Sequence, residues 1–169
     1  MKNYLSIVWD FLLLGALQVL FFNQVHLFGA GSVFIYVLFV LRLPLQISST
    51  GVMLLSAMMG VFIDVFSQSF GLHTAAIVLI AYLRPSILRM FFSPEEREKY
   101  APTYGLVGAN FFKYAVLMIL IHHITLFMLE AFSFKYMVSV LIKTLTSSLL
   151  TFLFVFVLEI IKRKNIRQW

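Results

Sequence analysis

The sequence contains no cysteine and little charge, and both absences exclude classes of protein. Without a single Cys among its 169 residues, the chain can form no disulfide, attach no haem through thioethers and build no thiolate metal site. Asp, Glu, Lys and Arg make up only 12% of the residues, about half the share found in soluble domains. The chain therefore lacks the polar surface that a water-soluble domain needs.

Motifs that carry enzymatic chemistry are also missing. The sequence has no Gly-x-Ser-x-Gly nucleophile elbow, no phosphate-binding Walker loop, no His-Glu-x-x-His zinc motif and no cluster of aspartates for metal-assisted phosphoryl transfer. Only seven acidic residues are present, and three of them, Glu95, Glu96 and Glu98, fall in one polar loop. We therefore expect a protein that is not an enzyme and that needs no cofactor.

Hydrophobic residues dominate what is present. They make up 62% of the chain, and the mean hydropathy is +0.97, which is typical of an integral membrane protein. A chain of this length has room for about six spans of roughly 20 residues with short loops. The first apolar stretch lacks a small-residue cleavage site, so we expect it to be a retained helix and not a signal peptide.

Six apolar segments are separated by polar residues, glycine or proline, and predict an all-α bundle of six transmembrane helices in a single domain, residues 1–169. They cover residues 4–22, 28–43, 51–69, 72–92, 106–132 and 136–161. The second is short of a full span unless Gly31 and its neighbours join it, because Arg42 and Pro44 bound it closely. We expect this segment to be tilted, partly re-entrant or buried against other helices.

The segments that follow the fourth and sixth helices are polar or basic. Residues 93–105 form the predicted cytoplasmic loop, in which Ser93, Pro94 and the acids that follow predict the N-cap and first turn of a short helix. Residues 162–169 form the predicted cytoplasmic tail.

The distribution of Lys and Arg predicts the orientation, because loops rich in these residues stay in the cytoplasm. With six spans, nearly all basic loop residues lie on the side of the two termini, whereas the other side carries only Lys135. The net charge of +6 is explained by this topology and by contact with anionic lipids, so no nucleic-acid partner is expected. The basic residues on the predicted cytoplasmic side are Lys2, Arg42, Arg89, Arg97, Lys99, Lys162, Arg163, Lys164 and Arg167.

Two charged residues fall inside the outer halves of predicted helices. Asp64 in the third helix and Lys143 in the sixth lie at similar depths at a rise of about 1.5 Å per residue, so an ion pair between them is possible. In a functional interpretation, Asp64 binds an ion, a proton or a partner. In a structural interpretation, the two residues fix the bundle, or Lys143 extends to the outer surface.

Arg84 and Pro85 form a second notable pair, in the fourth helix. The proline removes a backbone donor and predicts a kink. Arg84 can bond the freed carbonyls, pair with Asp10 in the first helix or extend to cytoplasmic headgroups.

Histidines do not form a convincing metal site. His122 and His123 are adjacent and project about 100° apart on a helix, and Glu130 follows seven or eight residues later. Metal-binding helices favour an i, i+4 spacing, so hydrogen-bonded packing is expected instead, and we predict no metal. His73 begins the fourth helix, where we expect a role in a cap or turn.

Small and polar residues recur every four positions on two predicted helices. Ser56, Gly60 and Asp64 share one face of the third helix. The sixth helix carries such a stripe at Ser139, Lys143, Ser147 and Thr151. These faces suit either packing inside the bundle or docking of a partner's membrane helix.

The run from Gly60 to Thr74 has the pattern Gly-x-x-x-Asp-x-x-Ser-x-Ser-x-Gly-Leu-His and is followed by Ala81-Tyr82-Leu83. With the chain length and six predicted spans, it resembles the MreD family of rod shape-determining proteins over essentially the whole chain. Gly60, Asp64, Gly71 and His73 match the family pattern.

The resemblance implies a non-enzymatic scaffold in the bacterial cytoplasmic membrane, with both termini in the cytoplasm. Such a protein would bind the membrane-anchored MreC and act with MreB, RodA and its penicillin-binding transpeptidase in lateral peptidoglycan synthesis. The family is also similar in fold to the substrate-binding S components of energy-coupling-factor transporters.

A substrate-binding subunit of a vitamin-type transporter is the alternative function. Polar residues at the outer ends of helices could line a small substrate cavity. However, the Ala-x-x-x-Ala motif usual in the first helix of such subunits is absent.

Overall fold

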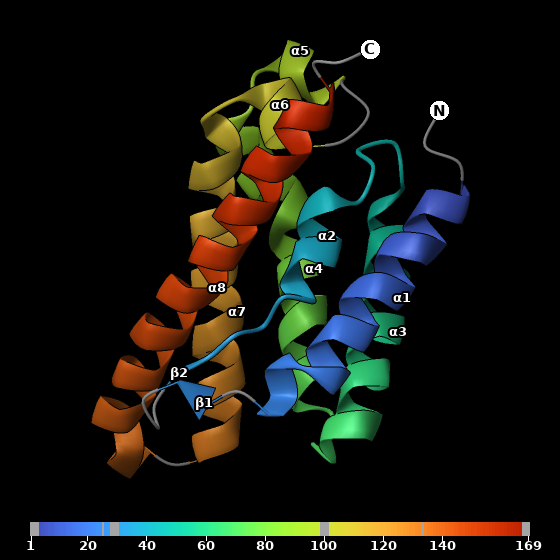
Figure 1. Cartoon of the computed structure of the whole chain (residues 1–169). Coiled ribbons are helices and arrows are strands. Elements are labelled where there is room, and N and C mark those ends of the chain that lie inside the picture. The colour runs from blue at the N-terminus through green and yellow to red at the C-terminus, as the bar shows by residue number, and fades with distance from the viewer. Residues whose placement is uncertain (1–3, 25, 28–30, 99–101, 133, 167–169) are drawn as a thin grey trace.

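The computed structural model describes residues 4–24, 26–27, 31–98, 102–132 and 134–166 and is all-helical apart from one small hairpin. Five of its helices are long and apolar enough to cross a membrane (Figure 1). The prediction of an all-α fold with several helices of membrane-spanning length is therefore confirmed, but the described residues contain five such helices and not the predicted six. The long helices are α1 (Tyr4–Leu20), α3 (Ser49–Ser67), α4 (Leu72–Phe91), α7 (Asn110–Ala131) and α8 (Met137–Ile166).

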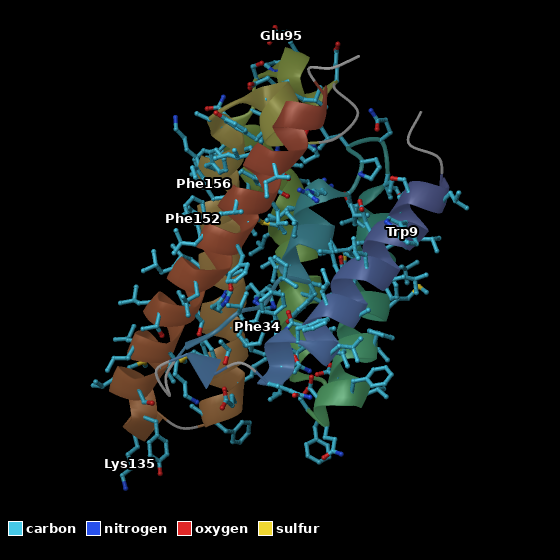
Figure 2. All side chains as sticks on the ribbon, viewed as in Figure 1. Trp9, Phe34, Glu95, Lys135, Phe152 and Phe156 are labelled. Carbon is cyan, nitrogen blue, oxygen red and sulfur yellow. The ribbon has the colours of Figure 1, made fainter. Side chains whose placement is uncertain are left out.

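Consecutive long helices pack side by side. α3 packs on α4, α4 on α7 and α7 on α8, while α1 lies against α3. The beginning of α1 and the end of α8 lie at the same end of the bundle (Figure 1). Figure 2 shows Glu95 and Lys135 at opposite ends. Of the residues that predict the orientation, Lys2, Lys99 and Arg167 lie outside the described residues.

Residues 28–43 do not form the long second helix that the sequence predicts. Residues 28–30 lie outside the described residues, Gly31–Ser32 form strand β2, and α2 (Val37–Arg42) has only six residues. Yet every residue from Val33 to Leu41 is buried inside the bundle. Hydropathy marks this segment as apolar, but it is covered by protein, where a non-helical backbone is tolerated.

The extended backbone of this segment finds its hydrogen-bond partners on α8. The N–H of Ser32 donates to Ser147 Oγ, and the N–H of Phe34 donates to Thr151 Oγ1, both at 3.0 Å. Four residues of helix rise about 6 Å, and two residues of extended chain rise about 6.6 Å, so the two spacings match. The polar stripe on α8 therefore faces inward here, and it supplies the acceptors that a buried extended chain needs.

A small hairpin of two strands, each of two residues, lies between α1 and the extended segment. Strand β1 (His26–Leu27) pairs antiparallel with β2 (Gly31–Ser32), after the short 3-10 helix η1 (Phe22–Gln24). A second 3-10 helix, η2 (Phe134–Tyr136), leads into α8.

The predicted fifth helix, residues 106–132, is divided in two. α6 (Tyr104–Val107) ends at Gly108, whose φ of 63° lies in the left-handed region, and α7 begins at Asn110. A residue with a side chain would be strained at this φ, so the glycine allows the break.

The predicted N-cap at Ser93 is confirmed. Ser93 Oγ accepts from the N–H of Glu96, and the N–H of Ser93 donates to Glu96 Oε2, which together form a capping box for α5 (Pro94–Arg97).

Candidate functional site

Asp64 caps the N-terminus of α4 from the last turn of α3. Its Oδ1 accepts from Ser69 Oγ at 2.7 Å and from the N–H of His73 at 3.0 Å. Its Oδ2 accepts from the N–H of Thr74 at 2.9 Å and from Thr74 Oγ1 at 2.6 Å. The carboxylate thus meets the orphan N–H groups and the positive dipole end of α4, which explains how a charge persists at this position.

Glycines at two positions make the α3–α4 turn possible. A Cβ atom on Gly60 would lie 2.4 Å from Thr74 Cα, so the two helices approach more closely here than any other residue allows. Gly71, immediately before α4, has a φ of 83°, which favours glycine. Ser56, one turn before Gly60, is fully buried and donates to the carbonyl of Val52 at 2.7 Å.

His73 begins a chain of buried side chains in the centre of the bundle. The Tyr36 hydroxyl lies 2.9 Å from His73 Nδ1 and 2.7 Å from His122 Nε2. Because the hydroxyl has one hydrogen, at most one of the two imidazoles accepts from it, and at least one donates to it. The sequence predicted a cap or turn role for His73, and its backbone N–H has that role, but its link to Tyr36 was not predicted.

His123 is held by a second set of contacts. Its Nδ1 donates to the carbonyl of Ile119 at 2.7 Å, and its Nε2 lies 3.3 Å from Thr151 Oγ1. Phe34 packs between the imidazoles of His73, His122 and His123, and Figure 2 shows it in the interior. Within the described ranges, no group of three or more His, Asp and Glu side chains is placed to hold a metal ion.

Lys143 pairs with Glu130 and not with Asp64. Its Nζ lies 3.0 Å from Glu130 Oε1 and 5.7 Å from the centre of the Phe127 ring. α7 and α8 are neighbours, so Glu130 is within reach of Lys143, whereas Asp64 is already bonded by groups that follow it in the chain. The ion pair between Asp64 and Lys143 that the sequence made possible is therefore not formed.

Arg84 is buried and has structural partners. It donates through Nε to the Tyr114 hydroxyl at 3.1 Å and through Nη2 to the carbonyl of Leu43. Of the predicted roles of Arg84, the nearest is a hydrogen bond to a backbone carbonyl. However, this carbonyl is that of Leu43, the C-cap of α2, and not one freed by Pro85. Pro85 lies inside α4, which continues to Phe91.

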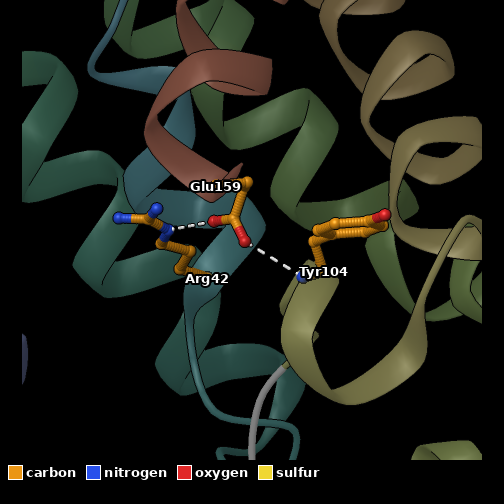
Figure 3. A network of polar contacts seen from close by, with 3 residues as sticks. All are labelled: Arg42, Tyr104 and Glu159. Atoms are coloured by element: carbon orange, nitrogen blue, oxygen red, sulfur yellow. Dashed lines mark hydrogen bonds and ion pairs between the residues drawn. The ribbon is translucent and has the colours of Figure 1, made fainter. Parts of the chain in front are cut away.

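A buried ion pair that the sequence did not predict joins α2, α6 and α8 toward the end of the bundle that carries α5 and α6 (Figure 3). Glu159 Oε1 accepts from Arg42 Nε at 2.5 Å, and Glu159 Oε2 accepts from the N–H of Tyr104 at 3.0 Å. Glu159 is only 1% exposed. A single acid in the apolar run of α8 was the signal that could have revealed it.

A cavity of about 710 Å³ lies at the end of the bundle that carries the α3–α4 and α7–α8 turns. Its apolar wall includes Phe22, Phe34, Phe66 and Phe127. A smaller cavity of about 210 Å³ shares Phe127, Glu130 and Lys143 with it. The polar side chains of the large cavity include Gln18, Asn23, Ser67, His73, Glu130 and Lys143.

No protein-family model, no curated protein and no solved structure matches this chain. What the site can do therefore follows from its geometry. The motif residues brace the turn that forms one wall of the cavity, and the cavity presents hydrogen-bonding groups, one ion pair and aromatic rings. Such a surface can bind a partner segment or a small molecule.

Proposed function

We propose that the protein is an MreD-like scaffold of the bacterial elongation complex. It binds MreC, and through MreC it acts with MreB, RodA and the penicillin-binding transpeptidase in lateral peptidoglycan synthesis and cell-shape maintenance. It lies in the cytoplasmic membrane with both termini in the cytoplasm, so the end of the bundle with the large cavity faces outward.

The observation that carries this proposal is the bracing of the α3–α4 turn. Four hydrogen bonds to Asp64, together with the close contact of Gly60 with Thr74, fix a turn whose tip is Phe70. Phe70 is fully exposed, with a relative accessibility of 101%. A large aromatic side chain on a rigid turn is a favourable contact for a partner, because little conformational entropy is lost on binding.

The contacts of Asp64 also favour a scaffold over an ion carrier. Both of its carboxylate oxygens accept hydrogen bonds from the α3–α4 turn and the first turn of α4. Arg84 likewise donates to Tyr114 and Leu43. These buried polar groups hold segments together, as expected of a bundle that presents a surface.

Co-purification with MreC tests the proposal. The tagged protein is expressed with the MreC of the same genome and purified in mild detergent, as wild type, as Phe70→Ala and as Phe132→Ala. Phe132 is the matched control, because it is 92% exposed on the α7–α8 turn. We expect stoichiometric MreC with wild type and with Phe132→Ala, and at least tenfold less with Phe70→Ala.

Two results of the same experiment would count against the proposed contact. If wild type recovers no MreC, the scaffold proposal is wrong. If Phe70→Ala recovers as much MreC as wild type, the protein binds MreC through another surface.

The large cavity favours a second candidate, a substrate-binding subunit of a vitamin-type transporter. Its volume of about 710 Å³ is within the range of small-molecule sites. This candidate predicts that an energising transporter module co-purifies in place of MreC.

A further inference from the structure

Gln18 places an unsatisfied acceptor in the wall of the large cavity. Its Nε2 donates to Asn23 Oδ1 at 3.0 Å and to the carbonyl of Val33 at 3.1 Å. Because a carbonyl only accepts, these contacts fix which end of the amide carries the nitrogen. Gln18 Oε1 is then left buried without a hydrogen-bond partner in the described part of the chain, although the residue lines the cavity. A buried acceptor of this kind fits a donor from a bound molecule.

The ion pair of Glu130 and Lys143 adds two opposite charges to the lining of the same cavity. Both side chains are partly exposed, at 47% and 40%, and they line both the large and the small cavity. The Lys143 ammonium has three N–H groups and the carboxylate has two oxygens, while the bond between them uses one of each. A ligand with two charges can therefore bind both side chains.

The remaining wall is apolar and aromatic. Phe22, Phe34 and Phe66 line the cavity, whose volume is about 710 Å³. The site thus combines a carboxylate for a cation, an ammonium for an anion, an amide oxygen for a further donor, and ring surfaces for an apolar group.

We propose that the large cavity binds a small zwitterion, in which an ammonium group and an acidic group lie close together. The ammonium donates to Glu130, the acidic group binds Lys143, and Gln18 Oε1 accepts a further donor of the ligand. A free amino acid and the phosphoethanolamine headgroup of a lipid share this chemistry. The inference does not depend on the MreC proposal, because it uses only the cavity wall.

Thermal unfolding of the full chain in a maltoside detergent tests this inference. The probes are L-phenylalanine and glycerophosphoethanolamine, and the single-charge controls are ethanolamine and glycerol 3-phosphate. We expect at least one zwitterion, at about ten times its Kd, to raise the unfolding midpoint by about 3–5 °C. Neither single-charge compound should do so.

Two pairs of variants locate the effect. Lys143→Met and Glu130→Gln should abolish the stabilisation, while Lys113→Met and Glu98→Gln, at exposed positions that do not line the cavity, should keep it. The midpoint without ligand reports whether each variant is folded. Stabilisation by L-phenylalanine alone indicates a free amino acid, and stabilisation by glycerophosphoethanolamine alone indicates a lipid headgroup.

The opposite results would overturn the inference. They are no stabilisation of wild type by either zwitterion, equal stabilisation by a single-charge compound, or stabilisation that persists in folded Lys143→Met.

Discussion

At the level of single residues, Asp64 and Gly60 both stabilise the contact between α3 and α4. Asp64 accepts hydrogen bonds from the N–H groups of His73 and Thr74 at the beginning of α4, and Gly60 lets the backbone of Thr74 approach α3. The cap requires the approach, since the carboxylate lies one helical turn after the glycine on the same face. Losing either residue should therefore loosen the turn that carries Phe70.

Gly60→Ala should destabilise the protein because the new Cβ would meet backbone, which cannot rotate away. We expect a loss of about 1–3 kcal/mol in the free energy of unfolding, measured by denaturant or thermal unfolding in detergent. Gly51→Ala on the same helix is the matched control, because its Cβ would meet only side-chain atoms, Ile47 Cγ2 at 2.9 Å and Ser48 Oγ at 3.2 Å, which can shift. That variant should lose clearly less stability than Gly60→Ala. Equal effects at the two positions would contradict the close α3–α4 contact.

Asp64→Asn should weaken the cap of α4, because the amide places an N–H₂ group against one of the donors and removes the charge. The expected loss is about 1–3 kcal/mol, and that of Ser69→Ala, which deletes one of the four bonds, about 0.5–1.5 kcal/mol. Thermal unfolding of the two variants beside Glu98→Gln, an exposed acid, measures both. An Asp64→Asn protein as stable as wild type would show that the cap is dispensable.

At the scale of elements, the extended segment between α1 and α3 depends on α8. Two backbone N–H groups of the segment donate to hydroxyls one helical turn apart on α8. Gln18 of α1 donates to the carbonyl of Val33 from the other side. The segment is therefore held between the first and last helices of the chain.

Removing the α8 hydroxyls should leave buried N–H groups without partners. We expect Ser147→Ala and Thr151→Val to lower the free energy of unfolding by about 1–3 kcal/mol each. Thr125→Val is the matched control, because the Thr125 hydroxyl donates only to Ile121 of its own helix at 2.8 Å. Hydrogen exchange at Ser32 and Phe34 should accelerate in the matching variant. Unchanged exchange and stability would show that the hydroxyls do not hold the segment.

Sequence patterns predicted the long helices well because each is a long apolar run bounded by polar residues, glycine or proline. The segment after Gly31 was expected to be short of a full span, and its burial against other helices was one of the expectations. Its extended backbone was not predicted, since hydropathy measures apolarity and does not distinguish an apolar helix from a buried extended chain. The position of Asp64 was recognised as significant, but its partners lie five to ten residues further along, across a turn. Long-range pairs such as Arg42 with Glu159 depend on packing that no local pattern records.

At the scale of the whole molecule, the positive charges predict which end of the bundle faces the cytoplasm. The chain contains no cysteine, so single cysteines report accessibility without background. In spheroplasts, a membrane-impermeant maleimide should label Phe70→Cys, whereas Glu98→Cys should react only after lysis. Both variants should react in detergent. The reverse pattern would invert the orientation and place the large cavity on the cytoplasmic side.

Crosslinking in living cells tests the proposed contact between the braced α3–α4 turn and MreC. A photoreactive amino acid replaces Phe70 or, as a control, Leu145, which is 64% exposed on the apolar surface of α8. With the protein made at its normal level, we predict a light-dependent adduct with MreC at position 70 and none at position 145. The absence of an MreC adduct at position 70 in cells that contain both proteins would show that this turn does not contact MreC.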